Sequence, residues 1–452
     1  MKPVEAASAP HKGIVQRIFQ NLGLLIGGKA TAGLLSLAYM VIAARALGPA
    51  DYGMLVLVHG FAMTVGGIVE FPGWHAVVRY GAQALEDADD GRLVRLLRFA
   101  AGVEGIGALL AMITVAVLSP IVGPRFGWSA EAQAFALPYS LAVLAAARAT
   151  PAGYLQLLGR FDLLGAHNAV APLVRLAGAA IAALLGAGLT GFLIAWLVAA
   201  LAEWASLWAM GAWLARRNIA AHRLLGPARG VIEENPGILR FMLAANADIT
   251  FGELAGRIAP LAVGWVLGPA AAGLYAVAQR GTVVIQQPAQ ILGQAAYAEF
   301  ARTVASHGRA SAVRRALVRC LAIALATALP VVLILTIFAR PLVVLIGGKA
   351  FAAAAPILIW LAMARVIMLV APPISAALVA LGRPVLSVGA NVATGLGLVP
   401  LLFLLMHRFG VIGAGVHAVI QAMASSALLV WFVWRASAPH PAAEPARAVE
   451  PG

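Results

Sequence analysis

The sequence is poor in the side chains on which soluble enzymes depend. Only 11% of its 452 residues are charged, and 18 acidic residues stand against 32 lysines and arginines. A single cysteine, Cys320, excludes an intrachain disulfide and a metal cluster built on cysteine. The sequence also has no spacing of residues typical of a metal site or a catalytic nucleophile. We therefore expect neither a soluble catalytic domain nor a metal or other cofactor.

We do not expect a nucleotide-binding site either. The stretch GLLIGGK, residues 23–29, fits the beginning of a phosphate-binding loop, but Ala30 occupies the position that requires Ser or Thr. No strand precedes it, and its small residues favour close helix packing instead. The energy for any transport must then come from an ion gradient, the membrane potential or the gradient of the substrate.

Long apolar runs dominate what is present. Hydrophobic residues make up 62% of the chain, and its mean hydropathy is +0.91. Runs of about 20 apolar residues are long enough, as helices, to cross a hydrocarbon core. The chain is therefore predicted to be an all-α integral membrane protein with twelve spans. They lie at 21–46, 52–72, 99–119, 132–158, 163–186, 190–214, 240–266, 273–298, 317–339, 355–380, 385–406 and 411–434.

The basic residues predict the orientation. Of the 32 lysines and arginines, 21 fall at the termini and in the even-numbered loops, 5 in the odd-numbered loops and 6 inside spans, when Arg45, Arg240 and Arg319 at the ends of their spans are counted with the adjoining loops. Because positive loops stay in the cytoplasm, both termini are predicted to be cytoplasmic. The main cytoplasmic loops are then 73–98, 215–239 and 299–316. Arginines such as Arg92, Arg95 and Arg98 are expected to meet anionic membrane lipids, and no nucleic-acid partner is expected.

Three short motifs recur at nearly constant spacing. LGPADYG at 47–53 returns as LGPAAAG at 267–273, QLLGRFDLLGAHN at 156–168 as VALGRPVLSVGAN at 379–391, and GLTG at 188–191 as GVIG at 410–413. The offsets are 220, 223 and 222 residues, which indicates the duplication of a six-helix unit. An even number of helices makes the two repeats parallel, with a two-fold axis along the membrane normal.

The duplication predicts the domain organisation. The chain consists of a cytoplasmic segment, an N-lobe with helices 1 to 6, a cytoplasmic linker, a C-lobe with helices 7 to 12 and a disordered cytoplasmic tail. These parts span residues 1–20, 21–214, 215–239, 240–434 and 435–452.

These features resemble a known family of transporters. A first helix that ends in RALGPADYG, a GR turn before the fifth helix, twelve helices and a basic inside face are similar to the oligosaccharide (O-antigen/polysaccharide biosynthesis) flippases. That family belongs to the multidrug/oligosaccharidyl-lipid/polysaccharide exporter superfamily. The resemblance covers about residues 14 to 435, and its most specific part runs from Asn21 to Gly53.

The resemblance implies a fold and an activity. It implies two lobes around a central cavity, alternating access and no enzymatic reaction. The implied substrate is an undecaprenyl-diphosphate-linked oligosaccharide, moved from the inner to the outer leaflet of the bacterial inner (plasma) membrane. A polysaccharide polymerase or export machinery is an expected partner.

Charged residues inside the predicted spans are the candidate site residues, because a charge at a helix centre costs about 3 kcal/mol. The substrate-binding candidates are Arg280, Arg257, Lys29, Arg148, Arg175 and Arg365. The ion-coupling candidates are Asp248, Glu253, Glu104, Glu203 and His59. The excess of cations favours an anionic substrate, since guanidinium groups bind phosphate oxygens in pairs. Arg280 is the leading ligand candidate, because no acid lies within one helical turn of it.

Each candidate also has a structural interpretation. Glu253 and Arg257 are four residues apart and can neutralise each other. Arg148 and Arg175 can form static ion pairs with Glu104 or Glu203. Lys29 can extend its ammonium group to the membrane interface. His59, His167 and His417 can pack as neutral side chains rather than carry protons.

Other functions stay open at this point. An ion-coupled drug or small-molecule exporter of the same superfamily would favour an acidic cavity. A membrane-embedded polymerase or glycosyltransferase would carry charged clusters in a large outside loop, but the longest outside loops, about 120–131 and 340–354, are short. A non-transporting scaffold would gain nothing from buried charge.

Overall fold

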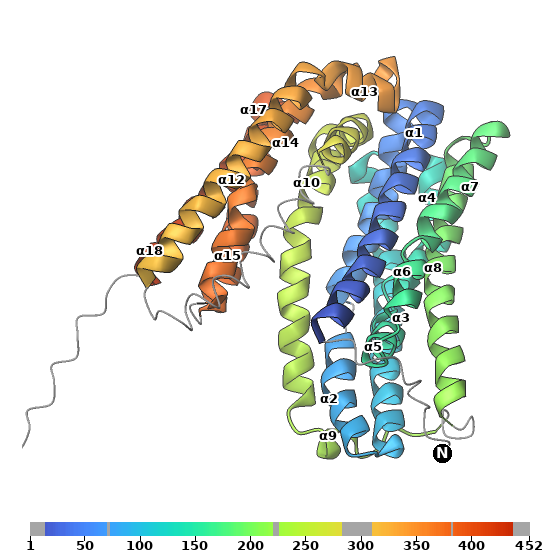
Figure 1. Ribbon diagram of the computed structural model, residues 1–452. Helices are drawn as coiled ribbons and strands as arrows, with labels where there is room; N and C mark the ends of the chain where they lie inside the picture. Colours follow the sequence, from blue (N-terminus) through green and yellow to red (C-terminus); the bar gives the residue numbers. More distant parts are fainter. Residues whose placement is uncertain (1–13, 70–72, 220–225, 283–309, 381–382, 437–452) are drawn as a thin grey trace, which may run out of the picture. The chain divides into compact units, whose positions relative to one another are not determined.

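The computed structural model describes residues 14–69, 73–219, 226–282, 310–380 and 383–436, in which every regular element is a helix. The chain divides into two compact units, residues 1–273 and 274–452. The first unit contains α1 (Ile14–Val69), α2 (Trp74–Glu86), α3 (Asp90–Val122), η1 (Gly123–Phe126), α4 (Ala130–Tyr139), η2 (Ser140–Ala145), α5 (Ala149–Leu157), α6 (Phe161–His167), α7 (Val170–Leu184), α8 (Gly188–Asn218), α9 (Val231–Glu234) and most of α10 (Ile238–Gly281) (Figure 1).

The second unit begins inside α10. It continues with α12 (Ala310–Ile337), α13 (Ala339–Gly347), η4 (Lys349–Ala354), α14 (Ala355–Ile367), η5 (Met368–Val370), α15 (Ala371–Ala380), α16 (Pro384–Gly397), α17 (Val399–Phe409) and α18 (Val411–Ala436). The predicted cytoplasmic tail from residue 437 onwards and the N-terminal segment before residue 14 lie outside the described residues. The lobe boundaries predicted from the sequence stay predictions.

The described residues contain nine helices that are long and apolar enough to cross a membrane, or ten if the bent pair formed by α12 and α13 is one span. The predicted membrane-spanning, all-helical fold is confirmed, whereas the count of twelve spans stays a prediction. The bent pair also corrects one predicted loop. Residues 340–354 are not an extended outside loop, because α12 turns by 67° into α13 and then into η4.

Each of the two longest helices is interrupted at the glycine of an LGP motif. Gly48 in α1 has φ 69° and ψ 179°, and Gly268 in α10 has φ 82° and ψ 178°. Only glycine adopts this region without strain, and the following Pro49 and Pro269 can begin a helix but not continue one. The helix boundaries predicted at both copies are thus confirmed, and α1 contains the first two predicted spans.

The two LGP copies also pack against each other within the first unit. A Cβ atom on Gly53 would collide with the carbonyl oxygen of Pro269, and one on Gly273 would collide with the carbonyl oxygen of Pro49. The contact is reciprocal, because each motif presents its last glycine to the proline of the other. This backbone contact explains why both copies end in glycine.

The GR turns have the same hydrogen bond in both copies. The amide of Arg160 donates to the carbonyl of Leu155 at 2.9 Å, and the amide of Arg383 donates to that of Leu378 at 2.9 Å. Both bonds close a helix end in the way that glycine-terminated helices do. Gly382, the second glycine of the pair, lies outside the described residues.

The third motif is also repeated in its backbone conformation. Gly188 at the beginning of α8 and Gly410 before α18 have φ values of 56° and 59°. Each of the three duplicated motifs therefore has a local feature that both copies share among the described residues.

Two predicted spans loosen near their middle, although each remains one apolar stretch long enough to cross a membrane, Ala130–Leu157 and Lys349–Leu378. In the span predicted at 132–158, the helix loosens into η2 and resumes at α5, where Pro151 is the third residue. In the span predicted at 355–380, it loosens into η5 and resumes at α15, which contains Pro372 and Pro373. Proline lacks the amide that an uninterrupted helix needs, and its ring clashes with the preceding turn.

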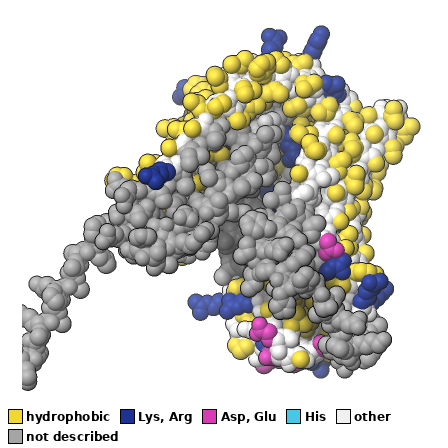
Figure 2. Space-filling model, viewed as in Figure 1, with side chains coloured by type: hydrophobic (Ala, Val, Ile, Leu, Met, Phe, Trp, Pro, Cys, Tyr) yellow, Lys and Arg dark blue, Asp and Glu magenta, His cyan; other side chains and the backbone are white. Residues whose placement is uncertain are grey.

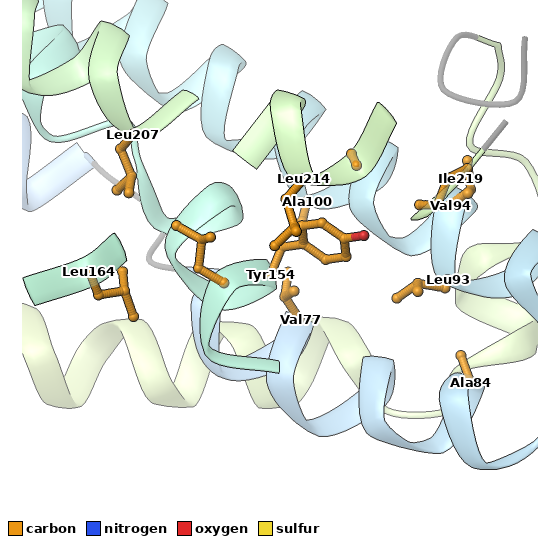
Figure 3. Close-up of a cluster of buried hydrophobic side chains, with 12 residues drawn as sticks. Val77, Ala84, Leu93, Val94, Ala100, Tyr154, Leu164, Leu207, Leu214 and Ile219 are labelled. Atoms are coloured by element: carbon orange, nitrogen blue, oxygen red, sulfur yellow. The ribbon is translucent and has the colours of Figure 1, made fainter. Parts of the chain in front are cut away.

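The predicted loop 73–98 is also mostly helical, since it contains α2 and the first turns of α3. A cluster of twelve buried side chains from α2, α3, α5, α6 and α8 and from Ile219 joins these elements. Figure 3 shows the ring of Tyr154 at its centre, near Leu214 and Val77. This end of the first unit is therefore a packed hydrophobic core rather than a loose loop.

Three arginines on α3 bind the chain itself, while their binding of anionic lipids stays a prediction. Arg92 binds Asn235, Arg95 binds Glu234 and Arg98 binds the carbonyl oxygen of Pro227, with N–O distances of 3.0, 2.7 and 3.1 Å. The segment between α8 and α10 is thereby fastened to the first unit. Figure 2 shows charged side chains gathered at this end, where α2 and α9 lie.

Large apolar side chains are exposed along the spans. Leu34 is 71% exposed, Leu184 87% and Leu329 63%. Hydrophobic side chains cover much of the surface in Figure 2 that is drawn in colour. An exposed apolar surface of this extent is typical of helices that face lipid.

Candidate functional site

The break between η2 and α5 exposes backbone groups inside the first unit. Glu104, a buried residue of α3, accepts hydrogen bonds from the amides of Ala149 and Thr150, the latter at 2.9 Å. A carboxylate is well placed there, because the amino end of a helix carries unsatisfied N–H groups and a partial positive charge. Glu104 therefore acts as the cap of α5.

The backbone carbonyl group on the opposite side of this break also has a hydrogen-bond partner. Pro151 has no amide to donate to the carbonyl oxygen of Ala147, so the indole N–H of Trp208 on α8 donates to it at 2.8 Å. Arg148 forms an ion pair with Glu203 of α8. The static pairing considered for Arg148 is thus present, and Glu203 is the partner.

Arg175 on α7 has a different kind of surrounding. Its Nη1 donates to the hydroxyl of Tyr39 at 3.3 Å, and its Nη2 lies 3.2 Å from Nε2 of His59. Its guanidinium carbon lies 5.7 Å from the ring centres of Tyr39 and Trp196, within the range of a cation–π interaction. Among the described residues no acid forms an ion pair with Arg175, so the static pairing considered for it is not seen.

The hydrogen bonds of the two ring nitrogens determine the protonation state of His59. Nδ1 of His59 lies 2.9 Å from the hydroxyl of Tyr139, which is 1% exposed. Because a guanidinium group only donates, Nε2 must accept the hydrogen bond from Arg175. His59 is therefore neutral and carries its proton on Nδ1, from which it donates to Tyr139. We infer this tautomer from the hydrogen-bond network.

Five predicted spans supply these residues, which we call the Arg175 cluster: Tyr39, His59, Tyr139, Arg175 and Trp196. Tyr39 and His59 come from the two arms of α1, on either side of the break at Gly48. The rings of Tyr39 and Trp196 meet edge to face at 5.1 Å, and Gly178 allows α7 to approach Ala195 of α8. The bend of α1 thus brings distant parts of the sequence to one arginine.

Arg175 keeps a donor that the described residues leave unused. Its Nε is buried and makes no hydrogen bond with the part of the chain that the structure describes. A buried donor without a partner is costly, by about 1–3 kcal/mol. Together with the missing acid, this spare N–H makes Arg175 well suited to bind an anion.

Arg257 on α10 is a second cation near the cluster. Its Nη1 donates to the carbonyl oxygen of Met63 on α1 at 2.6 Å. A Cβ atom at Gly67 would lie 2.6 Å from the same nitrogen, so glycine makes room for the guanidinium group. The charge of Arg257 also acts on His59. Arg257 and Arg175 therefore place two positive charges around one histidine.

The other candidates have different surroundings, or their side chains are not described. Lys29 is exposed on α1. Arg280 is half-buried near the end of α10 and makes no hydrogen bond or ion pair with the described residues. Arg365 is half-buried on α14, and its charge acts on the buried Tyr275.

Asp248 and Glu253 lie in α10, but their side chains are outside the part that the structure describes. The pairing of Glu253 with Arg257 therefore stays a prediction. The described residues hold no group of three or more His, Cys, Asp or Glu side chains suited to a metal ion.

Three members of the cluster were missed from the sequence. Tyr39, Tyr139 and Trp196 each stand alone in an apolar run, where an aromatic residue usually indicates packing. The only available signal was indirect: a buried cation that has no acid nearby needs neutral side chains as its partners. Nothing in the spacing of these residues indicates which arginine they contact.

The sequence matches a known protein family. Residues 42–356 match the family model described as "Polysaccharide biosynthesis protein". The chain belongs to this family. It is also 26% identical over 294 residues to the inner membrane protein YghQ of Escherichia coli (strain K12), a match that covers 64% of this chain and 82% of that protein.

Solved structures of transporters have the same fold. The lipid II flippase MurJ in an inward closed conformation superposes with a TM-score of 0.71 at 13% identity, over 92% of this chain and 90% of that one. An inward-facing multidrug resistance MATE family transporter of the MOP superfamily superposes with a TM-score of 0.61 at 16% identity, over 94% and 98%. The family match connects the chain with polysaccharide biosynthesis, and these solved structures show that it has a fold that is also found in transporters.

Proposed function

We propose that the protein moves an undecaprenyl-diphosphate-linked oligosaccharide from the inner to the outer leaflet of the bacterial inner membrane. The observation that carries the proposal is Arg175, a guanidinium group inside the membrane that neutral side chains hold and that keeps a buried, unused N–H. A diphosphate is the part of such a substrate that an arginine binds best, because its oxygens accept paired, charge-assisted hydrogen bonds.

The contrast with Arg148 supports this choice. Arg148 already has the carboxylate of Glu203, so an incoming phosphate would have to replace an ion pair. Arg175 would lose only hydrogen bonds and ring contacts with neutral groups. We therefore assign Arg148, Glu203 and Glu104 to the support of the helix break and Arg175 to the substrate.

Other cations belong to the same proposal. Arg257 lies close enough to act on His59 and would add a second positive charge for the diphosphate. Arg280 and Arg365 are half-buried and stay candidates for a later position of the substrate on its path. The central cavity and alternating access of the two lobes are part of this proposal.

The proposal includes an orientation. Both termini lie in the cytoplasm, and the LGP turns lie on the opposite side of the membrane, as the distribution of basic residues favours. Ala50 and Ala270, both exposed, mark the two turns. In a variant whose native Cys320 is replaced by Ser, a cysteine at either position should react with an impermeant maleimide in intact cells. Reaction only after permeabilisation would reverse the orientation.

A deletion strain tests the function itself. Loss of the gene should remove a surface or secreted polysaccharide and leave its lipid-linked precursor on the inner leaflet, and the wild-type gene should restore export. Unchanged polysaccharide together with increased sensitivity to cationic drugs would overturn the proposal in favour of a drug exporter. Analysis of the precursor separates a transport defect from a polymerase defect, because a missing polymerase leaves single repeat units on the outer leaflet.

A further inference from the structure

His59 stands between the two groups that define the Arg175 cluster. One ring nitrogen accepts a hydrogen bond from Arg175 at 3.2 Å, and the other donates to the buried hydroxyl of Tyr139 at 2.9 Å. A histidine in this position has one vacancy for a proton, Nε2, and that vacancy is the atom that holds the arginine. The side chain can therefore hold Arg175 or hold a second proton, but not both.

We infer that His59 is a proton-operated gate on Arg175: the neutral ring retains the guanidinium group, and the protonated ring releases it to bind the anionic head group. This inference rests on the proposed function, since it assigns a regulation to the same anion site. His59 would act through Arg175 and is a positioning residue in this role.

The proton transfer is simple in chemical terms. A proton from water adds to the lone pair of Nε2, and no other bond is made or broken in the ring. Nε2 then becomes a donor and faces a group that also only donates. The Nδ1–H bond to Tyr139 is unchanged, so the ring stays in place while the guanidinium group is repelled.

The charged groups around His59 determine under which conditions its ring binds a second proton. Arg175 contacts the ring from α7 and Tyr139 from α4, while Arg257 on α10 binds the carbonyl oxygen of Met63, one helical turn from His59 on α1. A third positive charge on His59 is unfavourable beside these two arginines in a membrane interior. The arrival of an anion with two or three negative charges removes that penalty. No acid among the described side chains contacts His59 and supplies the charge instead.

Anion and proton therefore favour each other's binding. By thermodynamic linkage, if the anion raises the affinity of His59 for a proton, the proton raises the affinity of the site for the anion by the same factor. The empty site stays closed, because Arg175 remains on His59. The cluster would thus bind a diphosphate and take up one proton in the same step.

Titration calorimetry of the purified full-length protein tests this coupling. Farnesyl diphosphate, a short diphosphate lipid, is the probe, and its binding heat is measured in two buffers of different ionisation enthalpy. Wild-type protein should take up about one proton more per bound probe than His59→Gln. The glutamine side chain can accept from Arg175 and donate to Tyr139, so it imitates the closed gate. We expect it to bind the probe at least about tenfold more weakly than wild type at pH 6.

His59→Ala is the complementary variant, because it removes the acceptor that holds Arg175. It should bind the probe at pH 8 more tightly than wild type and without the additional proton. His167→Gln is the matched control. His167 is also buried in the first unit but contacts Ser206, so its replacement should leave the wild-type proton uptake unchanged.

The outcomes separate the two proposals. If wild type and His59→Ala take up the same number of protons, or if His167→Gln alone loses the proton, the gate is wrong while the anion site stands. If wild-type protein does not bind the probe, or binds it as well after Arg175→Ala, both the anion site and the gate are wrong.

Discussion

Two of the interrupted spans, one in each unit, have different side chains bound to their exposed backbone groups. In the first unit, α5 resumes behind the carboxylate of Glu104, while Trp208 satisfies the carbonyl oxygen that Pro151 leaves open. In the second unit, the hydroxyl of Ser426 donates to the carbonyl oxygen of Ile367 at 3.2 Å beside η5. Among the described residues, no acid contacts that second break.

The difference shows that a broken span does not require charge. Ala371 occupies the place that corresponds to Arg148 at the 223-residue offset of the GR motif. A neutral side chain is sufficient beside the break in the second unit, whereas Glu104, Arg148 and Glu203 support the break in the first unit. We interpret the duplicated fold as functionally unequal, with most of the described ionisable groups placed in the first unit.

The largest effect on stability is expected at Arg148. Arg148→Ala leaves Glu203 without its partner, and because the two side chains are 37% and 21% exposed, the cost lies between about 1 kcal/mol for an exposed pair and about 3–5 kcal/mol for a buried one. Glu104→Ala should have a comparable effect, because it leaves the amides of Ala149 and Thr150 without acceptors. Thermal unfolding in detergent and the amount of protein in the membrane measure both losses.

A double variant provides the control for the ion pair. Arg148→Met with Glu203→Gln removes both charges and should be more stable than Arg148→Ala alone, because no buried charge remains. If the double variant loses the sum of the two single effects, the pair is not coupled and the comparison between the breaks fails.

A smaller effect of equal size is expected at the two LGP turns. A Cβ atom on Gly53 or Gly273 meets the backbone of the other motif, and overpacking of this kind costs about 1–3 kcal/mol. Gly33→Ala is the matched control, since no atom lies within 4 Å of its Cβ position and alanine favours the helix. Unfolding temperatures that differ greatly between Gly53→Ala and Gly273→Ala would contradict the reciprocal contact.

The smallest effect is expected at the neutral break. Ser426→Ala removes one hydrogen bond to the carbonyl oxygen of Ile367 and should cost about 0.5–1.5 kcal/mol. The same unfolding measurement applies. A loss as large as that of Glu104→Ala would show that the two breaks depend on their caps equally.

The local features of the fold were predictable from the sequence, because short-range chemistry determines them. A glycine followed by proline between two apolar runs can only be a helix boundary, and Gly48 and Gly268 confirm this. Pro151 carried a similar signal for the break in its span, but the long apolar run around it favoured one helix. The local signal of proline was the stronger one there.

The partners of the charged residues were much less predictable. Whether Arg148 or Arg175 has an acidic side chain as its ion-pair partner depends on which faces of α3, α7 and α8 pack together. The spacing of residues in the sequence does not contain that information. Arg92 illustrates the same limit, since its partner Asn235 lies 143 residues away. Tertiary packing decides whether an intramembrane arginine supports the fold or stays available to a ligand.

We assign Arg148 to the support of the fold and Arg175 to the binding of the substrate. Export of the polysaccharide and membrane abundance, measured together in a deletion strain that expresses each variant, test this assignment directly. Arg175→Ala should reduce export at least about tenfold at wild-type abundance, and Arg175→Lys should restore part of it, because lysine keeps the charge but not the paired hydrogen bonds. Arg148→Ala should lower abundance and export in proportion. Normal export by a stably expressed Arg175→Ala protein would contradict the account.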